Sequence, residues 1–394
     1  MQLSLKFVTG LLLATSAVFA AQDDIEVNLH RRNSFITAGN QLNVEAFAKH
    51  LLNVNNKYKD ALENFKRNMG HDHPLLSILL NGIKRNNGGQ GSLPLTDVQS
   101  ELLWSGDVTF GGQTFGMDFD TGSSDSLANP GAYNPRKSST SKNTWSSFSA
   151  AYGDGTQARG LVYTDDFEIA GLKAKNVAIG HSFTKFIEDQ EPAQGIAGMA
   201  FPSIQTFPKQ YKPFFESLKE QKAVKSGVFQ FTLKAGKGST LTLGGIDSSK
   251  YKGKVTYVDV DPSQGFWITD AKVNGHGIKA IIDSGSTIIT GPTSQVRSVV
   301  QNIKGMNAFN QDGTLMYTYD CNSTPNVTIS IGGTPFKLGK NQLSYGRANG
   351  QCVLPIAGQD GLPLNAWIVG DTFFQSVSVI FDTDKNRMGF ATQA

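Results

Sequence analysis

The stretch Phe115-Gly-Met-Asp-Phe-Asp-Thr-Gly-Ser-Ser124 recurs in pattern as Lys279-Ala-Ile-Ile-Asp-Ser-Gly-Ser-Thr287. Each copy is a strand-like run that ends in Asp, a small hydroxyl residue, Gly and two further hydroxyl residues. A hairpin-like turn precedes each copy, at residues 110–114 and 273–277. Ile-Ala-Gly at 196–198 follows the first copy, and Ile-Val-Gly at 368–370 follows the second. The same order of features occurs twice, which predicts two similar β-rich halves.

The two Asp residues of this repeat, Asp120 and Asp283, are 163 residues apart (283 − 120). Halves related by a pseudo-twofold axis would bring them face to face. Two carboxylates about 3 Å apart cannot both ionise, so one serves as a general base and the other as a general acid. Either loop alone is better explained as a tight turn capped by Asp. The pair predicts a catalytic dyad of Asp120 and Asp283.

The other residues of the two loops have predicted supporting roles. Glycine lets the backbone approach the carboxylates closely and donate its N–H groups, and the small hydroxyls fix the loops. The predicted supporting residues are Thr121, Gly122, Ser123, Ser284, Gly285 and Ser286.

The composition narrows the class of protein. The 394 residues include 42 Gly and 25 Phe, with 18% charged residues and a formal charge of +3. These values exclude a disordered chain, a collagen and a coiled coil, and they indicate no nucleic-acid groove. The two cysteines and six histidines show no metal-binding spacing, and no phosphate-binding loop is present. We therefore expect no metal, no cofactor and no nucleic-acid partner.

Residues 1–20 read as a signal peptide, with Lys6, an apolar stretch and a Val18-Phe19-Ala20 cleavage sequence. The alternative is a membrane anchor, but the apolar run is short and a polar segment follows it. We expect no membrane association after the signal peptide is removed. Export to an oxidising compartment predicts that Cys321 and Cys352 pair.

Residues 21–85 read as a helical pro-segment. The stretch 44–52 is amphipathic with helical period, and residues 57–69 are rich in helix formers. A dibasic pair, Lys84 and Arg85, precedes a Gly-rich stretch and is the predicted processing site, although an ordinary linker has a similar composition. The pro-segment carries 9 Lys/Arg against 7 acids, and residues 86–394 carry 26 of each. Acidification would therefore make the two parts repel each other.

From residue 92 to residue 394 the sequence resembles the pepsin-like aspartic endopeptidases, particularly the secreted fungal members of the aspergillopepsin and polyporopepsin type. Besides the two Asp loops, the matching motifs are Tyr152-Gly-Asp-Gly-Thr156, Leu243-Gly-Gly-Ile-Asp-Ser248, Gly265-Phe-Trp267, Trp367-Ile-Val-Gly-Asp-Thr-Phe373 and Asn386-Arg-Met-Gly-Phe-Ala391. The resemblance implies an all-β, bilobal fold of two pseudo-twofold-related lobes with a cleft between them. The N-terminal lobe would span residues 86–255 and the C-terminal lobe residues 256–394.

The resemblance also implies roles for individual residues. It makes Asp120 and Asp283 the catalytic dyad, and it makes Ser123 and Ser286 their outer hydroxyl donors. Tyr152, Gly153 and Asp154 would form the tip of a flap over the substrate. Cys321 and Cys352 match the second-lobe disulfide. A pro-segment lysine that pairs with the dyad would be Lys57, with Lys49 and Lys66 as alternatives.

The sequence departs from the family pattern at Leu127, where the family has a Trp that hydrogen-bonds the flap tyrosine. Trp145 is the nearest replacement in the sequence. The sequence therefore does not identify the hydrogen-bond partner of the Tyr152 hydroxyl. Gln194 stands where an Asp is common, and we expect little effect of that change on the chemistry.

The expected function is a secreted aspartic endopeptidase, made as a zymogen and acting at acid pH. An alternative is a catalytically impaired binding homologue on the same fold. A two-carboxylate glycosidase would need a wider carboxyl separation, of roughly 5 to 9.5 Å. We expect extended polypeptide substrates, inhibition by pepstatin-like compounds and a monomer. The chain ends at Ala394, straight after the last matching strand, which favours release from the cell over a lipid anchor. A vacuolar destination is the less favoured alternative. Asn322 and Asn326 lie in glycosylation sequons.

Overall fold

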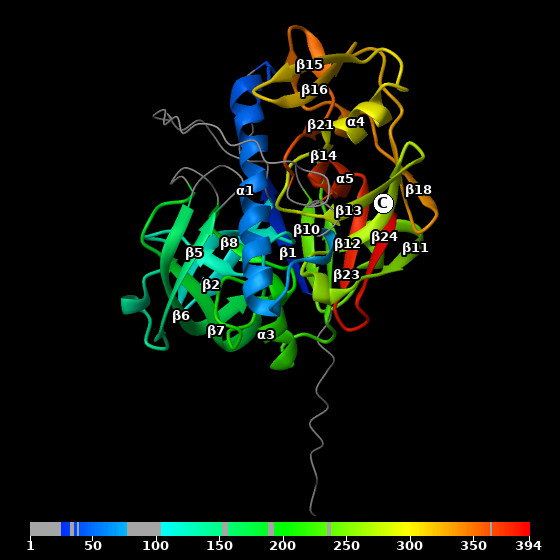
Figure 1. The fold of residues 1–394 in the computed structure, drawn as a ribbon. Helices are drawn as coiled ribbons and strands as arrows, with labels where there is room; N and C mark the ends of the chain where they lie inside the picture. The colour runs from blue at the N-terminus through cyan, green and yellow to red at the C-terminus, as the bar shows by residue number, and fades with distance from the viewer. Residues whose placement is uncertain are drawn as a thin grey trace, which may run out of the picture.

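The computed structural model describes residues 25–31, 35–37, 39–76, 104–151, 157–187, 193–234, 238–362 and 365–394. Its described strands form two sheets, of 13 and 11 strands. Figure 1 shows the first half of the chain, in cyan and green, below and to the left of the second half, in yellow and orange. The molecule is thus built from two β-rich lobes.

The first sheet runs through the whole N-terminal lobe. In spatial order its strands are β11 (Tyr251–Asp259), β24 (Arg387–Gln393), β23 (Val377–Asp382), β9 (Val228–Thr232), β10 (Ser239–Leu243), β1 (Ile25–Arg31), β2 (Trp104–Phe110), β3 (Gln113–Asp120), β8 (Ala193–Gly198), β4 (Ser126–Ala128), β7 (Leu172–Ser182), β6 (Gln157–Ile169) and β5 (Lys142–Ala151). The last strands of the chain, β23 and β24, lie in this sheet beside β9 and so tie the two halves together.

The second sheet belongs to the other lobe. In spatial order its strands are β18 (Thr334–Lys337), β17 (Thr328–Ile331), β12 (Ile268–Val273), β13 (His276–Ile282), β22 (Trp367–Val369), β14 (Ile289–Pro292), β21 (Ile356–Gln359), β16 (Thr314–Tyr319), β20 (Gln351–Val353) and β19 (Arg347–Ala348), with β15 (Asn307–Gln311) paired to β16.

The described helices are short, apart from the helix of the predicted pro-segment. The α-helices are α1 (Val44–Met69), α3 (Phe214–Glu220), α4 (Thr293–Val300) and α5 (Asp371–Phe374). The 3-10 helices are η1 (Pro135–Lys137), η2 (Pro202–Ile204), η3 (Ser248–Lys250), η4 (Pro262–Gln264) and η5 (Asn341–Leu343).

The sequence repeat has a counterpart in the strand pairing. The hairpin β2–β3 corresponds to β12–β13, and each second strand runs parallel to a strand that carries the apolar-apolar-Gly motif, β8 or β22. That motif strand pairs antiparallel with a short strand, β4 or β14, which in turn pairs parallel with β7 or β21. The same four pairings in both lobes confirm the predicted pair of similar β halves.

The predicted pro-segment is a helix only in part. Residues 44–69 form the single helix α1, which begins at the Asn43 N-cap and ends at Gly70 in the left-handed conformation. Ile25–Arg31 instead form strand β1, which lies between β10 and β2 in the first sheet. Its apolar residues alternate at positions 25, 27 and 29, which is the period of a strand rather than of a helix.

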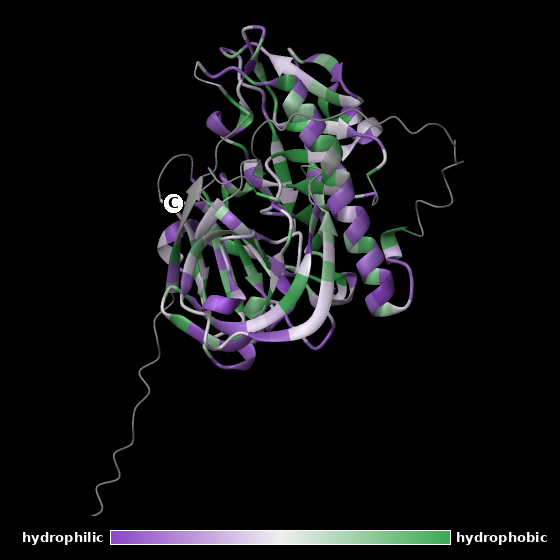
Figure 2. Cartoon of the chain, turned by 90° about the vertical axis from the view of Figure 1, so that its left-hand side faces the viewer, coloured by the Kyte–Doolittle hydropathy of each residue, from purple (hydrophilic) through white to green (hydrophobic). Residues whose placement is uncertain are grey.

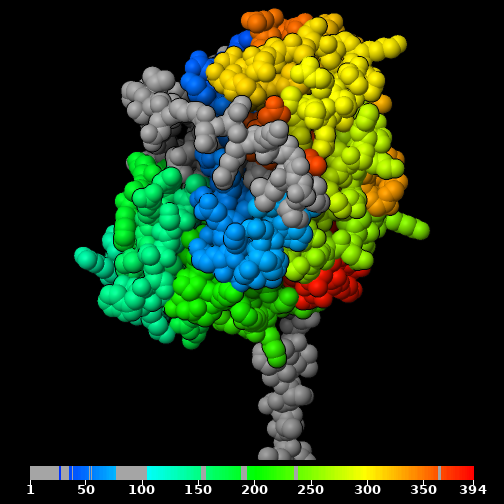
Figure 3. Space-filling model, in the orientation of Figure 1, coloured from blue at the N-terminus to red at the C-terminus, as the bar shows by residue number. Residues whose placement is uncertain are grey.

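Helix α1 packs one face against both lobes. Phe47 and Leu51 lie in a cluster with Ile288 and Met316 of the second lobe. Farther along the helix, the side chains at 54, 58, 61, 62 and 65 pack on residues from both halves, including Ile204 and Ile281. Figure 3 shows α1, in blue, between the green first lobe and the yellow second lobe. Figure 2 shows the helix carrying hydrophobic and hydrophilic residues on different sides, as expected for a docked amphipathic helix.

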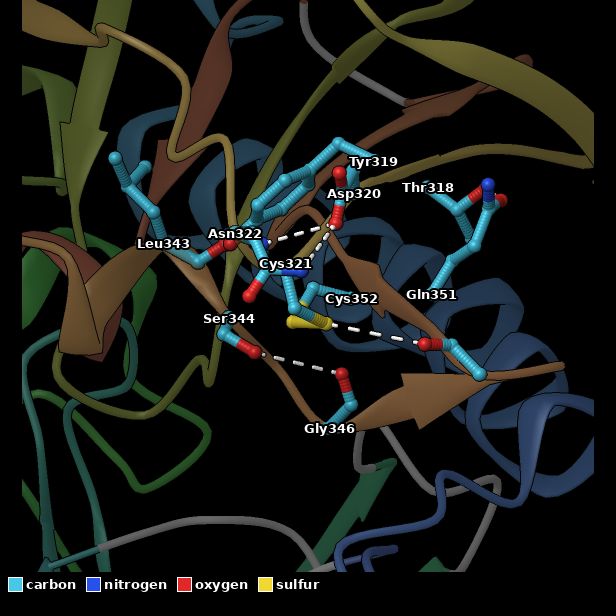
Figure 4. Close-up of a disulfide and its surroundings, with 11 residues drawn as sticks. Thr318, Tyr319, Asp320, Cys321, Asn322, Leu343, Ser344, Gly346, Gln351 and Cys352 are labelled. Carbon is cyan, nitrogen blue, oxygen red and sulfur yellow. Dashed lines mark hydrogen bonds between the residues drawn. A yellow bond between two sulfur atoms is a disulfide. The ribbon is translucent and has the colours of Figure 1, made fainter.

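The predicted disulfide is confirmed: Cys321 and Cys352 are bonded. The bond links the end of β16 to β20, beside the Tyr319–Cys352 register pair of these strands (Figure 4). Thr318 Oγ1 donates a hydrogen bond to Gln351 Oε1 at 2.6 Å across the same two strands. The crosslink therefore reinforces a pairing that the backbone already makes.

Replacing Cys352 with Ser, together with Cys321→Ser, is expected to lower the free energy of unfolding by about 3 kcal/mol, because the crosslink constrains a loop of 31 residues in the unfolded chain. Chemical denaturation of the precursor at neutral pH measures the change. An unaltered denaturation midpoint would contradict this role. Peptide hydrolysis by the folded double variant should be unchanged.

Candidate active site

The two Asp loops begin where a buried strand of each lobe ends. Asp120 is the last residue of β3, and Asp283 follows directly after β13. Their exposed fractions are 4% and 0%. The apolar runs before them place these strands in the core, so each carboxylate emerges from the interior of its lobe toward the other lobe.

Each carboxylate is held by its own loop in the same way. The Gly122 N–H donates to Asp120 Oδ1 at 2.8 Å, and Ser123 Oγ donates to Asp120 Oδ2 at 2.5 Å. In the second loop, the N–H of residue 285 donates to Asp283 Oδ1 at 2.9 Å, and the hydroxyl of residue 286 donates to Asp283 Oδ2 at 2.7 Å. The structure thus places four of the predicted supporting residues, Gly122, Ser123, Gly285 and Ser286, in equivalent contacts.

The remaining two supporting residues join the loops to each other. Ser284 N–H donates to Thr121 Oγ1 at 2.9 Å, and Thr121 N–H donates to Ser284 Oγ at 3.1 Å. The Thr121 hydroxyl donates to Ile282 O, and the Ser284 hydroxyl donates to Phe119 O. These four buried bonds cross between the lobes and fix the two carboxylates relative to each other.

Glycine is required at the centre of both loops because the two lobes approach so closely. A Cβ atom on Gly122 would lie 2.5 Å from Asp283 Oδ1, and a Cβ atom on Gly285 would overlap Asp120 Oδ1. The motif glycines Gly198 and Gly370 are equally confined, because a Cβ atom there would overlap the backbone of the first and second Asp loop, respectively. The close packing of the two loops therefore requires glycine at these positions of the repeat.

Lys57 of α1 lies directly between the two carboxylates. Its Nζ donates to Asp120 Oδ1 at 2.9 Å and to Asp283 Oδ2 and Oδ1 at 3.1 and 3.3 Å. The next residue, Tyr58, donates its hydroxyl to Asp283 Oδ2 at 2.7 Å. All four side chains are at least 90% buried. The helix therefore covers the whole dyad with one ammonium and one phenol.

This contact sets the charges of the dyad. Burial would lower the pKa of Lys57, but the two carboxylates raise it above its ordinary value, so the ammonium stays charged. Burial would raise the pKa of Asp283, but Lys57 and the hydroxyls of Tyr58 and Ser286 hold it at about 2. Burial raises the pKa of Asp120, against the opposing field of Lys57. The two carboxyls thus have different proton affinities although their loops match.

The other two lysine candidates point elsewhere. Lys49 pairs with Glu45 on the exposed side of α1. Lys66 pairs with Asp72 after the helix, and it is exposed as well. Among the three candidates, the structure brings only Lys57 to the dyad.

The flap candidates Tyr152, Gly153 and Asp154 lie outside the described residues, as do the signal peptide and the processing pair Lys84–Arg85. Ala151 at the end of β5 is described, and its N–H donates to Asp60 Oδ2 of α1 at 2.8 Å. Among the described strands, β5 lies at the edge of its sheet. Helix α1 thus also contacts the strand that leads to the predicted flap.

Leu127 is buried where the family pattern has Trp. It packs with Phe148, Ile196 and Phe207, and a Cβ atom on Gly180 would overlap its side chain. Trp145 does not approach this cluster, because its side chain is 85% exposed on β5. The site of the missing Trp is therefore filled by aliphatic and aromatic packing around Leu127.

Among the contacts of α1 that were not predicted are the hydroxyl bond of Tyr58 and the Asp60 bond to β5. The sequence holds a weak signal for the first of them. Residues 57, 58, 61 and 65 follow helical spacing, which places them on one face of α1. Once Lys57 is placed on the dyad, this spacing turns Tyr58 and Ala61 toward the same surface.

In the part of the chain that is described, no cluster of three or more His, Cys, Asp or Glu side chains has the arrangement of a metal site. No helix among the described residues is long and apolar enough to span a bilayer.

Comparison with known proteins places this geometry in a family. Residues 104–393 match the family model of the eukaryotic aspartyl proteases. Secreted aspartyl protease 1 of Malassezia globosa is 50% identical over 393 residues, covering 99% of both chains. Aspergillopepsin-1 of Emericella nidulans is 33% identical over 77% of this chain and 82% of its own.

A more distant relative, the "probable inactive secreted aspartyl protease" of Malassezia globosa, is 30% identical and spans both chains fully. This chain has both Asp loops, with matching hydrogen bonds. It has the bilobal fold of the pepsin-like proteases, and it is a secreted aspartic-type endopeptidase. The chain therefore belongs to the eukaryotic aspartyl protease family.

Proposed function

We propose that Asp120 and Asp283 hydrolyse peptide bonds with a water molecule held between them once α1 has left. One carboxylate removes a proton from the water, whose oxygen attacks the scissile carbonyl carbon. The other carboxyl donates its proton to the carbonyl oxygen, and collapse of the tetrahedral species returns a proton to the leaving amine. The observation that carries this proposal is the matched pair of buried carboxylates, each held by one backbone N–H and one hydroxyl.

The structure that we describe is then an inhibited precursor. Lys57 Nζ lies within 3.3 Å of oxygens from both carboxylates, which is the position that the catalytic water needs. We assign residues 1–20 to a signal peptide, residues 21–85 to the pro-segment and Lys84–Arg85 to its processing site. Residues 86–255 and 256–394 form the two catalytic lobes in this proposal, with the C-terminal strands β23 and β24 returning to the first sheet.

The substrate is a polypeptide bound in extended form. The outer edge of β5, which Asp60 now contacts at Ala151, offers backbone groups for strand addition. We assign the flap to Tyr152, Gly153 and Asp154 on the residues that follow this strand. The active form acts as a monomer in this proposal, and Asn322 and Asn326, which are both exposed, are the candidate glycosylation sites.

Hydrolysis of a denatured protein from pH 2 to 7, with and without pepstatin, tests the proposal. The purified precursor is first held at acid pH. We expect cleavage confined to acid pH and abolished by pepstatin. Absence of cleavage at every pH, in a preparation whose pro-segment has been removed and which still binds pepstatin, would favour the impaired binding homologue instead.

A further inference from the structure

A histidine that follows α1, His73, is buried with hydrogen bonds that only a neutral imidazole ring can make. His73 has an exposed fraction of 0%. Its Nδ1 accepts a hydrogen bond from the Leu75 N–H at 3.1 Å, so Nδ1 carries no proton. Its Nε2 lies 2.7 Å from the carbonyl oxygen of Gln264 and must donate to it. Both ring nitrogens are thus committed, one as an acceptor and one as a donor.

Protonation of this ring conflicts with its surroundings. A proton on Nδ1 would face the Leu75 N–H, so a hydrogen bond would be replaced by two opposed donors. His73 also caps the turn that begins at Pro74, and a positive charge is unfavourable beside the free N–H groups of a helical turn. The ring lies against Phe65 of α1 and Phe266, which offer no compensating charge.

The ring is linked to the dyad through a shared neighbour. Phe266 contacts His73 with ring centroids 5.9 Å apart and contacts Tyr58 with centroids 5.4 Å apart. Tyr58 in turn donates its hydroxyl to Asp283. Gln264, which His73 binds, ends η4 just before Phe266. Displacement of His73 therefore disturbs the packing that holds Tyr58 and Lys57 over the two carboxylates.

We propose that His73 is the acid-sensitive lock of the precursor: its protonation undocks the end of α1 and thereby begins the exposure of the dyad. This proposal rests on the proposed function, because it concerns regulation of the same site. In this proposal, undocking of α1 on acidification begins with the protonation of one residue of the pro-segment. It does not begin with repulsion between the pro-segment and the catalytic lobes as a whole.

The direction of the pH effect follows from the docked geometry. Burial lowers the pKa of His73 from its ordinary value of 6.5, while the backbone bond to Gln264 and the charge of Asp261 on η4 oppose that shift and His71 on the same turn adds to it. Docking is therefore at full strength above about pH 6.5 and weakens as the pH falls toward the lower docked pKa.

Other carboxyls around α1 act differently. Burial raises the pKa of Asp60 and raises that of Asp125, beside Arg67, to about 6, so both favour docking as the pH falls. Asp283 acts in the releasing direction, but its pairing with Lys57 weakens only below the ordinary carboxyl value of 3.8. Among these groups, His73 is the one that favours release between about pH 6.5 and pH 4.

A pH-jump experiment on the full-length precursor tests the lock. His73→Asn keeps an acceptor for the Leu75 N–H, and His73→Gln keeps a donor that can reach Gln264. Neither side chain takes up a proton. His71→Gln is the matched control, because it removes a histidine two residues away that is exposed. The readout is the rate at which hydrolysis of a fluorogenic peptide appears after a jump from pH 7.5 to a series of lower values.

We expect both His73 variants to develop activity at least about fivefold more slowly than the wild type at pH 5.5, and to need a lower pH for the same rate. His71→Gln should slow activation far less than either His73 variant, because the charge of His71 is the smallest of the influences on His73. Equal rates for all four proteins would overturn the proposal, and so would an equal slowing by His71→Gln, which would indicate general charge repulsion. Absence of hydrolysis in every protein at every pH would instead count against the proposed function.

A second measurement decides the case in which a His73 variant is already undocked and active at pH 7.5. The six histidine rings of the Asp120→Asn precursor are titrated by NMR, with His73 assigned through His73→Gln. We expect His73 to titrate below 6.5 and in step with loss of the docked state. Titration of His73 at the ordinary value, while α1 stays docked, would overturn the proposal. This reading does not depend on catalysis.

Discussion

Asparagine in place of Asp120, or of Asp283, should abolish peptide hydrolysis while the protein still folds. Asparagine has nearly the same shape as aspartate: its Oδ1 can still accept from the Gly N–H, and its Nδ2 can donate to the Ser hydroxyl oxygen of its loop, which reverses the direction of that bond. It cannot take up or release a proton at the pH of catalysis. General acid–base catalysis contributes up to about 10⁴-fold per step, so we expect a fall in kcat of at least about 10³-fold for either variant.

The measurement requires the pro-segment to be removed in the same way from every protein. A protease specific for dibasic sites, added in trans, serves this purpose because the variants cannot process themselves. Asp270→Asn is a matched control, because Asp270 lies in β12 of the second lobe and is 81% exposed beside Lys279. Retention of more than a tenth of wild-type activity in Asp120→Asn or Asp283→Asn, with the control unchanged, would refute the assignment of the dyad.

The second large effect is expected at Lys57. Replacing it with Met removes the ammonium and leaves two buried carboxylates facing a thioether. Leaving one partner of a buried ion pair uncompensated costs about 3–5 kcal/mol, so docking of α1 should weaken by at least about a hundredfold. The precursor should then hydrolyse a peptide substrate without prior acid treatment.

Binding of labelled pepstatin to the uncleaved precursor at pH 6.5 measures this opening directly. The apparent affinity of an inhibitor rises with the fraction of molecules whose dyad is uncovered. Lys49→Met and Lys66→Met are the controls, because both lysines form exposed pairs away from the dyad. Equal pepstatin binding by Lys57→Met and the wild type would show that the apolar face of α1 closes the site without the lysine.

The ion pair between Lys57 and Asp283 also sets a lower pH limit for docking of α1. Lys57 and its hydroxyl neighbours hold the pKa of Asp283 at about 2, so the contact is complete above the ordinary carboxyl value of 3.8 and is lost as the pH falls toward 2. Lys57→Met removes this limit, whereas the His73 variants leave it in place. The two sets of variants are therefore expected to change different parts of the activation profile.

The repeated loops could be predicted because their information is local and occurs twice. The turn at an Asp-hydroxyl-Gly sequence after a buried strand depends only on neighbouring residues. The duplication predicts that the two copies lie close together. Lys57 could be proposed because the resemblance implies a pro-segment lysine that pairs with the dyad. The choice among Lys49, Lys57 and Lys66 needed the structure, because it depends on which face of the helix is docked.

The features that were not predicted depend on contacts between distant segments. Strand β1 pairs with β10 in a register that joins Ile25 to Leu243, and no local pattern specifies such a partner. The burial of His73 depends on where the turn after α1 meets η4. The exposure of Trp145 follows from its place at an irregularity of β5, which lies at the edge of its sheet among the described strands.

Strand β1 makes cutting and release two separate events. Five of its residues are in register with β10 and two with β2, so backbone pairing holds it on both sides within the sheet. A cut at the dibasic pair breaks one covalent bond and none of these pairings. Before the cut, the inhibitor is tethered, and its effective concentration is independent of dilution. After the cut, the pro-segment is a separate chain that can rebind, so the degree of inhibition depends on the protein concentration.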